Sequence, residues 1–414
     1  MSSLDYVTVD GNGSSVMEGS MNNIIPSSRK AIIIGAGIGG LTTALFLQRQ
    51  GWEVVIYEKK RELSEFGAGI VLAANAMHIL SELGMAEQVR EAGAQVGMAE
   101  IRSWDGKPIT SVPVSKQAAK YGTYSYLIHR AKLQKILFQQ LNEFSTVYLN
   151  KKLIAFDQDP HHVIVHFDDG TEDTGHILIG ADGIHSQVAH LLFGLKQLRY
   201  SGFKAFRGIT SFLDKRYMPE IGGGFEAWGR GRRFGFSQLG EGQVFWFAAI
   251  NADSGTVVDC KKDYVLQQFE GWHNPIERAI QSTDEMAILT HDIHDRIPLE
   301  RWSQGRVTLL GDAAHPMLPN LGQGGAQTME DALVVARCLE GISILSLRSV
   351  TAALQSYERN RIARTNQVVR QSRRMARIVQ MSNPAAIMLR NQVLRVVPDE
   401  VQMKQLDWLL GYRV

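Results

Sequence analysis

The sequence predicts an α/β protein in which an antiparallel sheet is inserted into a parallel unit and a helical segment ends the chain. Two observations indicate the parallel unit: short, continuously apolar runs, typical of strands buried on both faces, and a glycine-rich turn that joins the first of these runs to a helix. The third is a central segment in which aromatic residues dominate strand-like runs. With 414 residues, the chain can form roughly two to three domain-sized units.

The first unit begins with the apolar run 31–34, followed by the turn Gly35-Ala36-Gly37-Ile38-Gly39-Gly40. Residues 41–50 place apolar side chains at helical spacing, Gly51 ends this helix, and 53–58 form a second strand. A strand, a helix and a second strand within about 30 residues make a βαβ unit. The pattern predicts a Rossmann-like fold.

The glycines of this turn predict a dinucleotide site. Gly35 permits the tight turn, Gly37 lets the backbone approach a pyrophosphate, and Gly40 lets the helix and strand pack closely. The helix that begins here would direct its unpaired amides toward the phosphates. Glu58, at the end of the second strand, is placed to bind a ribose. We expect Ile38, Gly39 and Lys59 to line the same site.

Further elements follow along the chain. We expect helices over 74–83, 129–144 and 325–339, and strands over 163–167, 177–180 and 307–310. From about 200 to 293, the strand-like runs 225–236 and 244–250 flank a hairpin turn at 240–242 and carry many aromatic residues. By strand alternation, roughly half of these aromatic side chains should face inward. The remainder is helical and rich in arginine, and we expect the arginines after Glu358 to form a solvated face.

Two later segments combine with the glycine turn to give a specific pattern. Residues 177–186 end a strand in Asp182-Gly183, and residues 306–316 end another in Gly311-Asp312. The second continues from His315 as H-P-x-x-P-x-x-G-Q-G-x-x-x-x-x-E-D-A, through Ala332. From 29 to about 377, the chain resembles the class A flavoprotein hydroxylases, and especially salicylate hydroxylase-like, urate hydroxylase and zeaxanthin epoxidase members.

The resemblance implies a para-hydroxybenzoate hydroxylase-like fold and an FAD site. It divides the chain into a leader (1–28), an FAD-binding domain (29–98, 124–197 and 296–370), a substrate domain (99–123 and 198–295) and a C-terminal helical segment (371–414). Besides the residues of the glycine turn and Glu58, the implied cofactor contacts are Arg130, Asp182, Gly183, Gly311, Asp312, Pro319, Gly322, Gly324 and Gly325. On the flavin face or the substrate side it implies Arg207, Pro319 and Gly324. The chain departs from the family at Ala189, where an arginine is common.

Residue chemistry agrees with these roles. The Asp312 carboxylate can accept a hydrogen bond from a ribityl hydroxyl, although a helix cap is the alternative. The helix that opens at Gly322–Gly325 can stabilise negative charge on a reduced flavin by about 0.3–2 kcal/mol. Arg207 either faces the flavin or the substrate, or it forms a structural salt bridge.

The activity implied by the resemblance is monooxygenation. NADPH or NADH would reduce FAD, O2 would form a C4a-hydroperoxide, and one oxygen would pass to an apolar aromatic or alkene-bearing small molecule by hydroxylation or epoxidation. Two alternatives stay open at this point. One is a flavin dehydrogenase or reductase that inserts no oxygen, and the other is a non-catalytic flavoprotein.

Composition excludes several other classes. Lys plus Arg total 44 against 42 for Asp plus Glu, so nothing indicates a nucleic-acid partner. Cys260 and Cys338 lack paired spacing, and a strand spacing would separate His291 from His294, so we expect neither a disulfide nor a metal site. No apolar run is long enough to span a membrane. We expect a cytoplasmic monomer or homodimer. The alternative is peripheral contact with a membrane through the C-terminal helices, because residues 385–397 are fairly apolar.

Overall fold

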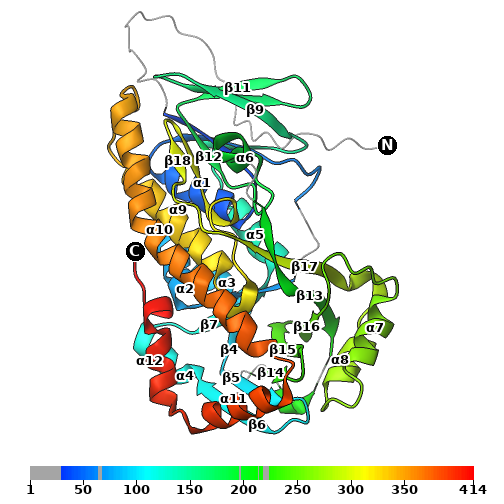
Figure 1. Ribbon diagram of the computed structural model, residues 1–414. Coiled ribbons are helices and arrows are strands. Elements are labelled where there is room, and N and C mark those ends of the chain that lie inside the picture. The colour runs from blue at the N-terminus through cyan, green and yellow to red at the C-terminus, as the bar shows by residue number, and fades with distance from the viewer. Residues whose placement is uncertain (1–28, 64–67, 195–196, 213, 218–222) are drawn as a thin grey trace, which may run out of the picture.

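The computed structural model describes residues 29–63, 68–194, 197–212, 214–217 and 223–414, so the expected leader lies outside the described part. Its first layer is a six-stranded sheet in the order β18-β19-β12-β1-β2-β8 (Figure 1). The pairs are parallel, except for β18 with β19. The bounds are β1 (Lys30–Ile34), β2 (Glu53–Tyr57), β8 (Ser145–Tyr148), β12 (Ile177–Gly180), β18 (Ser303–Gln304) and β19 (Val307–Leu309).

Helices pack against this sheet in a connected series. Helix α1 (Ile38–Arg49) contacts α5 (Arg130–Phe138) and α9 (Gly324–Leu339), and α9 contacts the long helix α10 (Leu347–Val379). Almost every residue of α1 is buried, because the helix lies between the sheet and its helical neighbours. The carboxyl ends of β1, β12 and β19 therefore meet the beginnings of α1 and α9 at one edge.

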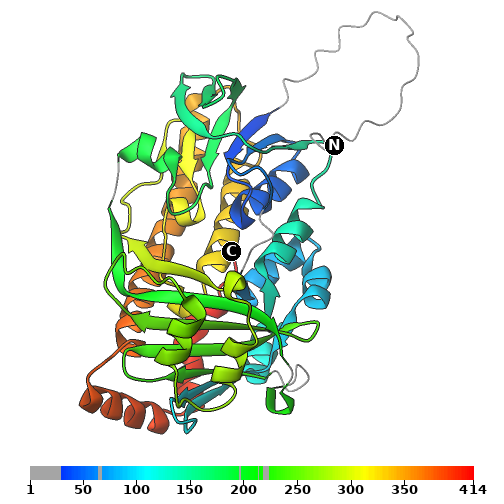
Figure 2. The same cartoon turned by 90° about the vertical axis from the view of Figure 1, so that its right-hand side faces the viewer.

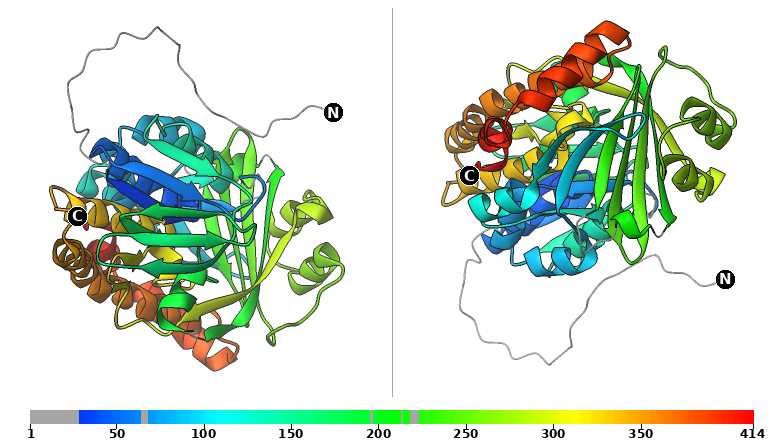
Figure 3. Two further views of the ribbon diagram at one scale, coloured as in Figure 1. Left: turned by 90° about the horizontal axis from the view of Figure 1, so that it is seen from above. Right: turned by 90° about the horizontal axis from the view of Figure 1, so that it is seen from below.

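A seven-stranded sheet forms the second layer, in the order β17-β13-β16-β15-β14-β5-β6. It is antiparallel except where β14 pairs with β5. The bounds are β5 (Met98–Ser103), β6 (Pro108–Pro113), β13 (Leu198–Ser211), β14 (Gly224–Trp228), β15 (Arg232–Gly240), β16 (Gln243–Asn251) and β17 (Leu289–Arg296). Figure 3 shows this sheet edge-on, with α7 (Lys261–Gln268) and α8 (Ile276–Gln281) outside it and the parallel unit inside. The sequence-based prediction of an α/β fold with an inserted antiparallel sheet is confirmed.

The two faces of this sheet divide its aromatic residues as strand alternation predicts. Phe206, Phe225, Phe234, Phe236 and Trp246 form a core with α7 and α8. Phe203 packs on the other face with Leu318, which directly precedes Pro319, a residue expected on the flavin face.

Smaller elements complete the fold. The three-stranded sheets are β9 (Leu153–Gln158), β10 (Val163–Phe167) and β11 (Glu172–Gly175), and β3 (Gly69–Leu72), β4 (Ala94–Val96) and β7 (Ser125–His129). The remaining helices are α2 (Ala74–Glu82), α3 (Ala86–Ala92), α4 (Val114–Tyr121), α6 (Gln187–Phe193), α11 (Pro384–Val396) and α12 (Asp399–Leu410). None of the described helices is long and apolar enough to cross a membrane.

Two secondary-structure predictions were wrong in extent. The helix expected over 129–144 ends at Phe138, before the turn that leads to β8. The run 225–236 is not one strand, because Gly231 (φ +63°) forms a turn that separates β14 from β15. The expected hairpin at 240–242 is confirmed, since Gly240 pairs with Gln243 across Glu241 and Gly242, both of positive φ.

Candidate active site

The glycine turn joins β1 to α1, and steric contacts explain most of its glycines. A Cβ on Gly35 (φ +108°) would lie 2.5 Å from the Ala181 carbonyl oxygen, and one on Gly40 would lie 1.9 Å from that of Gly35. A Cβ on Gly39 would lie 2.4 Å from Thr328 of α9, so this glycine permits helix packing. A Cβ on Gly37 would meet nothing within 4 Å. The space beside Gly37 is therefore open to a ligand.

A cavity of about 370 Å³ lies beside this turn. It gathers these predicted cofactor residues: Gly35, Gly37, Ile38, Glu58, Lys59, Arg130, Asp182 and Gly183. Gly39 and Gly40 are absent from its described lining because they face the protein interior. No side chain caps the start of α1, so its first amides and the positive end of its dipole face the cavity.

Glu58 holds the backbone of the turn while facing this cavity. Its Oε2 accepts from the Ala36 amide at 3.0 Å, and its Oε1 accepts from the Lys60 amide at 3.0 Å. Each carboxylate oxygen has further lone pairs, so the side chain can also accept from a hydroxyl. The structure thus places Glu58 where the sequence predicts the ribose contact.

The two motif aspartates differ in what they bind. Asp182 caps α6, since its Oδ2 accepts from the amides of Gln187 (2.7 Å) and Val188 (3.2 Å) and its Oδ1 from the Ser186 hydroxyl. Among the described residues, the Asp312 carboxylate makes no hydrogen bond or ion pair, and it caps no helix. Burial raises the pKa of Asp312, while His315, Arg130 and Arg296 oppose that rise. The protein atoms around Asp312 cause this desolvation, but the residue keeps an exposed surface, through which its carboxylate can accept a hydrogen bond from a sugar hydroxyl.

The loop that leads into α9 forms the second part of the site. Gly322 adopts a left-handed conformation (φ +62°), and α9 begins at Gly324 without a side-chain cap. A Cβ on Gly324 would meet nothing within 4 Å, whereas one on Gly325 would lie 2.7 Å from Ile70 of β3. The amides at the start of α9 are thus free to bind an anionic group. Pro319 lies exposed at the beginning of this loop.

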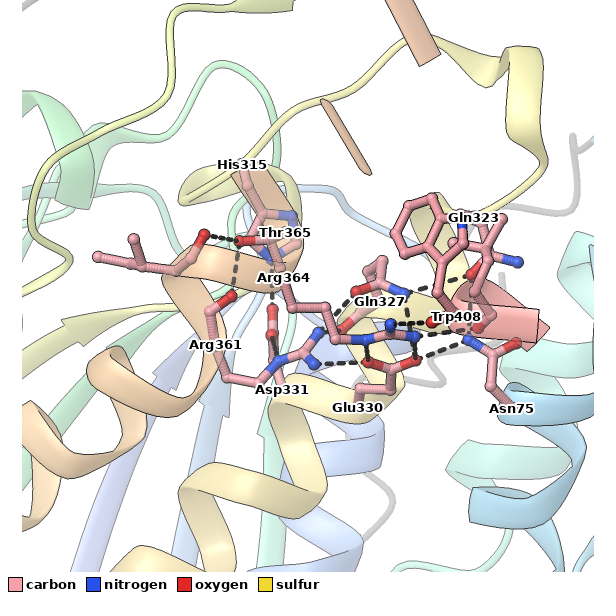
Figure 4. Close-up of polar contacts among 12 residues, drawn as sticks. Asn75, His315, Gln323, Gln327, Glu330, Asp331, Arg361, Arg364, Thr365 and Trp408 are labelled. Atoms are coloured by element: carbon pink, nitrogen blue, oxygen red, sulfur yellow. Dashed lines mark hydrogen bonds and ion pairs between the residues drawn. The ribbon is translucent and has the colours of Figure 1, made fainter. Parts of the chain in front are cut away.

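A buried charged cluster supports this loop from behind (Figure 4). Asp331 accepts from the Gly311 amide at 3.0 Å and from His315 Nε2 at 2.5 Å through Oδ2, and from Arg361 Nε at 2.6 Å through Oδ1. Its neighbour Glu330 accepts from Arg361 and Arg364. The carboxylate of Asp331 therefore fixes the turn that carries Asp312.

Side-chain amides connect this cluster to the loop that leads into α9. Glu330 Oε1 accepts from Asn75 Nδ2 at 2.6 Å and from Gln327 Nε2 at 3.1 Å. Asn75 Nδ2 also donates to Gln323 Oε1 at 3.0 Å. Gln323 immediately precedes α9, so the network sets where that helix begins.

The expectation that the arginines after Glu358 form a solvated face was wrong for part of them. Arg361 is fully buried in the cluster, and Arg373 pairs with the buried Asp295 at 2.8 Å. Arg359, Arg370, Arg374 and Arg377 are exposed as expected. The missed signal was spacing, since Arg361 falls at helical intervals from the buried Tyr357 and Thr365.

Sequence reasoning also missed Arg296 and Gln134. Arg296 donates to the Ile184 carbonyl at 2.7 Å and to the Ala313 carbonyl at 3.2 Å, and so ties the Asp-Gly and Gly-Asp turns together. Gln134 of α5 donates to the Ala36 carbonyl at 2.7 Å. Neither lies within a motif, so only the three-dimensional structure identifies them.

Arg207 lies on the sheet face opposite the α7–α8 core. It alternates with Phe206 on β13, shares a face with Phe203 and Ala205, and pairs across the strands with Phe247. Burial lowers the pKa of Arg207, and the nearby Arg130 lowers it further. Among the described residues Arg207 has no ion-pair partner. Of the two alternatives for Arg207, the described residues therefore do not provide the structural ion pair, and its contact with the flavin or substrate stays a prediction.

The donor set fits FAD. The open approach at Gly37 and the uncapped start of α1 fit a pyrophosphate, and the uncapped start of α9 fits a flavin edge. The carboxylates of Glu58 and Asp312 fit the hydroxyls of a ribose and of a ribityl chain, respectively.

We predict that Asp331→Asn destabilises the protein in a pH-dependent way. Burial alone would raise the pKa of Asp331, but His315 and Arg361 hold it below its usual value. The stabilisation is therefore complete above the unfolded-state pKa of about 3.9 and is lost as the pH falls through the folded-state pKa. We expect urea unfolding near neutral pH to show a loss of about 3–5 kcal/mol, which shrinks below about pH 4.

Asp169→Asn is the matched control, because Asp169 pairs with Lys151 in an exposed turn. It should change stability much less. If the difference in unfolding free energy between wild type and Asp331→Asn grew toward acid pH, Asp331 would not be the ionised, paired group.

Comparison with known proteins agrees with this geometry. A family model described as an FAD binding domain matches residues 28–208 and 270–372. The chain is 40% identical over 375 residues to the aurachin C monooxygenase/isomerase of Stigmatella aurantiaca, covering 89% of this chain and 94% of that protein. It is 30% identical over 353 residues to the FAD-dependent urate hydroxylase of Klebsiella pneumoniae, covering 83% and 89% respectively.

A solved structure shows the same architecture. Klebsiella pneumoniae HpxO in complex with FAD and uric acid superposes with a TM-score of 0.85 at 28% identity, covering 94% of this chain and 99% of that one. Together with the fold and the site, these matches show that the chain belongs to the class A family of FAD-dependent monooxygenases.

Proposed function

We propose that this monooxygenase consumes NADH or NADPH and oxygenates an apolar aromatic or alkene-bearing molecule, with aurachin C as the first candidate. The observation that carries the substrate class is the inner face of the antiparallel sheet. There Phe247 pairs with Arg207 across the strands, and Phe245 is the next residue of β16 on the same face. Phe245 lies so close to β3 that a Cβ on Gly69 would be 2.8 Å from its ring. The similarity to aurachin C monooxygenase/isomerase supports that candidate.

We propose these roles for the residues around FAD. The α1 start with Gly35, Gly37 and Ile38 binds the pyrophosphate, and Glu58 with Lys59 binds the adenosine end. Asp312 binds the ribityl chain, while Asp182 acts indirectly by capping α6 beside Gly183. When bound, FAD supplies the redox chemistry that activates O2.

The substrate side of the site has a distinct set of roles. Amides at the start of α9, at Gly324 and Gly325, stabilise negative charge on the flavin, and Gly322 gives the loop its turn. Pro319, exposed at the beginning of this loop, lies on the flavin face, and its neighbour Leu318 packs on Phe203 of the sheet. Arg207 orients a polar group of the substrate, because it is half-buried on the inner face of the sheet and its guanidinium has donors to spare.

The proposed function is tested by oxidation of NADH and of NADPH by the FAD-loaded protein. We expect aurachin C to accelerate oxidation, with O2 consumed and one oxygen gained by the product in mass analysis. Acceptor reduction without O2 uptake would indicate the dehydrogenase alternative instead. If neither nucleotide is oxidised faster with any aromatic or alkene-bearing compound tested, the proposed substrate class is wrong.

We predict that Glu58→Gln weakens FAD binding about ten- to hundredfold, because a hydrogen bond to a charged group contributes about 1.5–3 kcal/mol. Titration of deflavinated protein with FAD, followed by flavin fluorescence, measures this change. Glu87→Gln is the control, since Glu87 is exposed and pairs only with Arg90 in α3. Unchanged FAD affinity in Glu58→Gln would remove Glu58 from the site.

We predict that Arg207→Gln lowers kcat/KM for the accepted substrate by about ten- to hundredfold and leaves the FAD content unchanged. The reason is loss of the charged donor that faces the substrate. Arg216→Gln serves as the control, because Arg216 is largely exposed and pairs with Asp214. Equal kcat/KM in wild type and Arg207→Gln would contradict this role, and a parallel loss of FAD would make Arg207 a cofactor residue.

A further inference from the structure

Helix α11 presents apolar side chains to solvent. Met388, Leu389, Val393 and Val396 are 61%, 62%, 50% and 77% exposed, respectively. Their spacing places them along one face of the helix, together with the polar Gln392. This is the reverse of an ordinary surface helix, whose outer face is polar.

The inner face of α11 fixes the direction of this stripe. Leu394 packs beside Ile109 and Trp228 of the seven-stranded sheet. Arg390 is 7% exposed, and its guanidinium lies 4.8 Å from the centre of the Trp228 ring. Its Nη1 also donates to the Ile378 carbonyl at 3.0 Å. The stripe therefore faces outward because the opposite face is anchored.

The described residues leave the stripe on α11 exposed. Figures 1 and 2 show α11 along the lower end of the molecule, beyond the sheet and the end of α10. The sequence of α11 contains no acidic residue. Arg395 of α11, and Arg374 and Arg377 in the last turns of α10, are exposed. None of these three arginines forms an ion pair with a residue that the structure describes.

We propose that α11 docks on an anionic phospholipid surface, with Met388, Leu389, Val393 and Val396 inserted between the headgroups. Arg395 lies on α11 beside the stripe, and Arg390 ties α11 to the end of α10 that carries Arg377. Exposed apolar and arginine side chains on neighbouring helices suit the interface of a negatively charged bilayer. A symmetric contact between two copies would use the same patch on both subunits and bring arginines close to arginines. Charge therefore favours the lipid surface over a second copy. The inference is independent of the proposed reaction, because docking needs neither substrate nor nucleotide.

Cosedimentation of the FAD-loaded protein with vesicles tests the proposal. We expect binding to phosphatidylcholine vesicles that contain phosphatidylglycerol, and weaker binding to phosphatidylcholine alone or in raised salt. The double variant Leu389→Glu/Val393→Glu should bind the anionic vesicles about tenfold more weakly or worse. Arg377→Gln and Arg395→Gln should each weaken binding about fivefold.

Two controls match these variants. Val257→Glu places the same charge on a side chain that is 82% exposed in the loop before α7. Arg359→Gln removes an exposed arginine of α10 about 27 Å along the helix from Arg377. Both should bind vesicles as wild type does, and retained FAD absorbance shows that every variant is folded.

The proposal is overturned if wild type does not bind the anionic vesicles, or if Leu389→Glu/Val393→Glu binds them equally well. It is also overturned if sedimentation velocity shows that wild type self-associates through this stripe, with a dimer that the double variant abolishes and no vesicle binding. That result would assign the stripe to a second copy of the chain.

Discussion

The burial of two adjacent carboxylates, Glu330 and Asp331, is the constraint on which the site depends. Both are fully buried, and an unpaired charge there would be strongly destabilising. Arg361 meets both of them, and Arg364 completes the pairing of Glu330 while also donating to the carbonyls of Trp408 and Leu409. Helices α9, α10 and α12 are thereby held together through one cluster. The loop before α9 and the Gly311 turn take their positions from it.

The charge balance of this cluster matters as much as its geometry. Two carboxylates near the start of α9 would by themselves weaken the positive potential that the helix offers to an anion. Arg361 and Arg364 offset these two charges, so the amides at Gly324 and Gly325 keep their attraction for negative charge. The cluster thus fixes the loop without reversing its electrostatics.

Local sterics explain which parts of the fold and the site the sequence predicts. Gly40 is required by its contact with Gly35, and the positive φ of Gly35 favours glycine there, so their turn is visible in a short window of sequence. The approach of Ala181 to Gly35 comes from a distant segment. Glu58 follows from the length of one βαβ unit. By contrast, the pairing of Arg361 with Asp331 joins helices that are far apart in the sequence, and periodicity could show only that Arg361 faces inward. The same limit applies to Arg296, whose two acceptors lie in separate turns.

The two faces of the seven-stranded sheet explain why we propose Arg207 as a residue of the site and not of the core. The outer face of the seven-stranded sheet packs its aromatic side chains against α7 and α8. The charge of Lys204 on that face is paired with Asp292 at 2.6 Å. On the inner face, Arg207 lies near Arg130, and burial lowers the pKa of the neighbouring His291, while Arg207 and Lys204 lower it further. Neither form of the His291 ring carries a negative charge, so His291 cannot offset the positive charge of Arg207. In the proposed site, the positive charge of Arg207 and the start of α9 would both stabilise a substrate or cofactor ring in its anionic form.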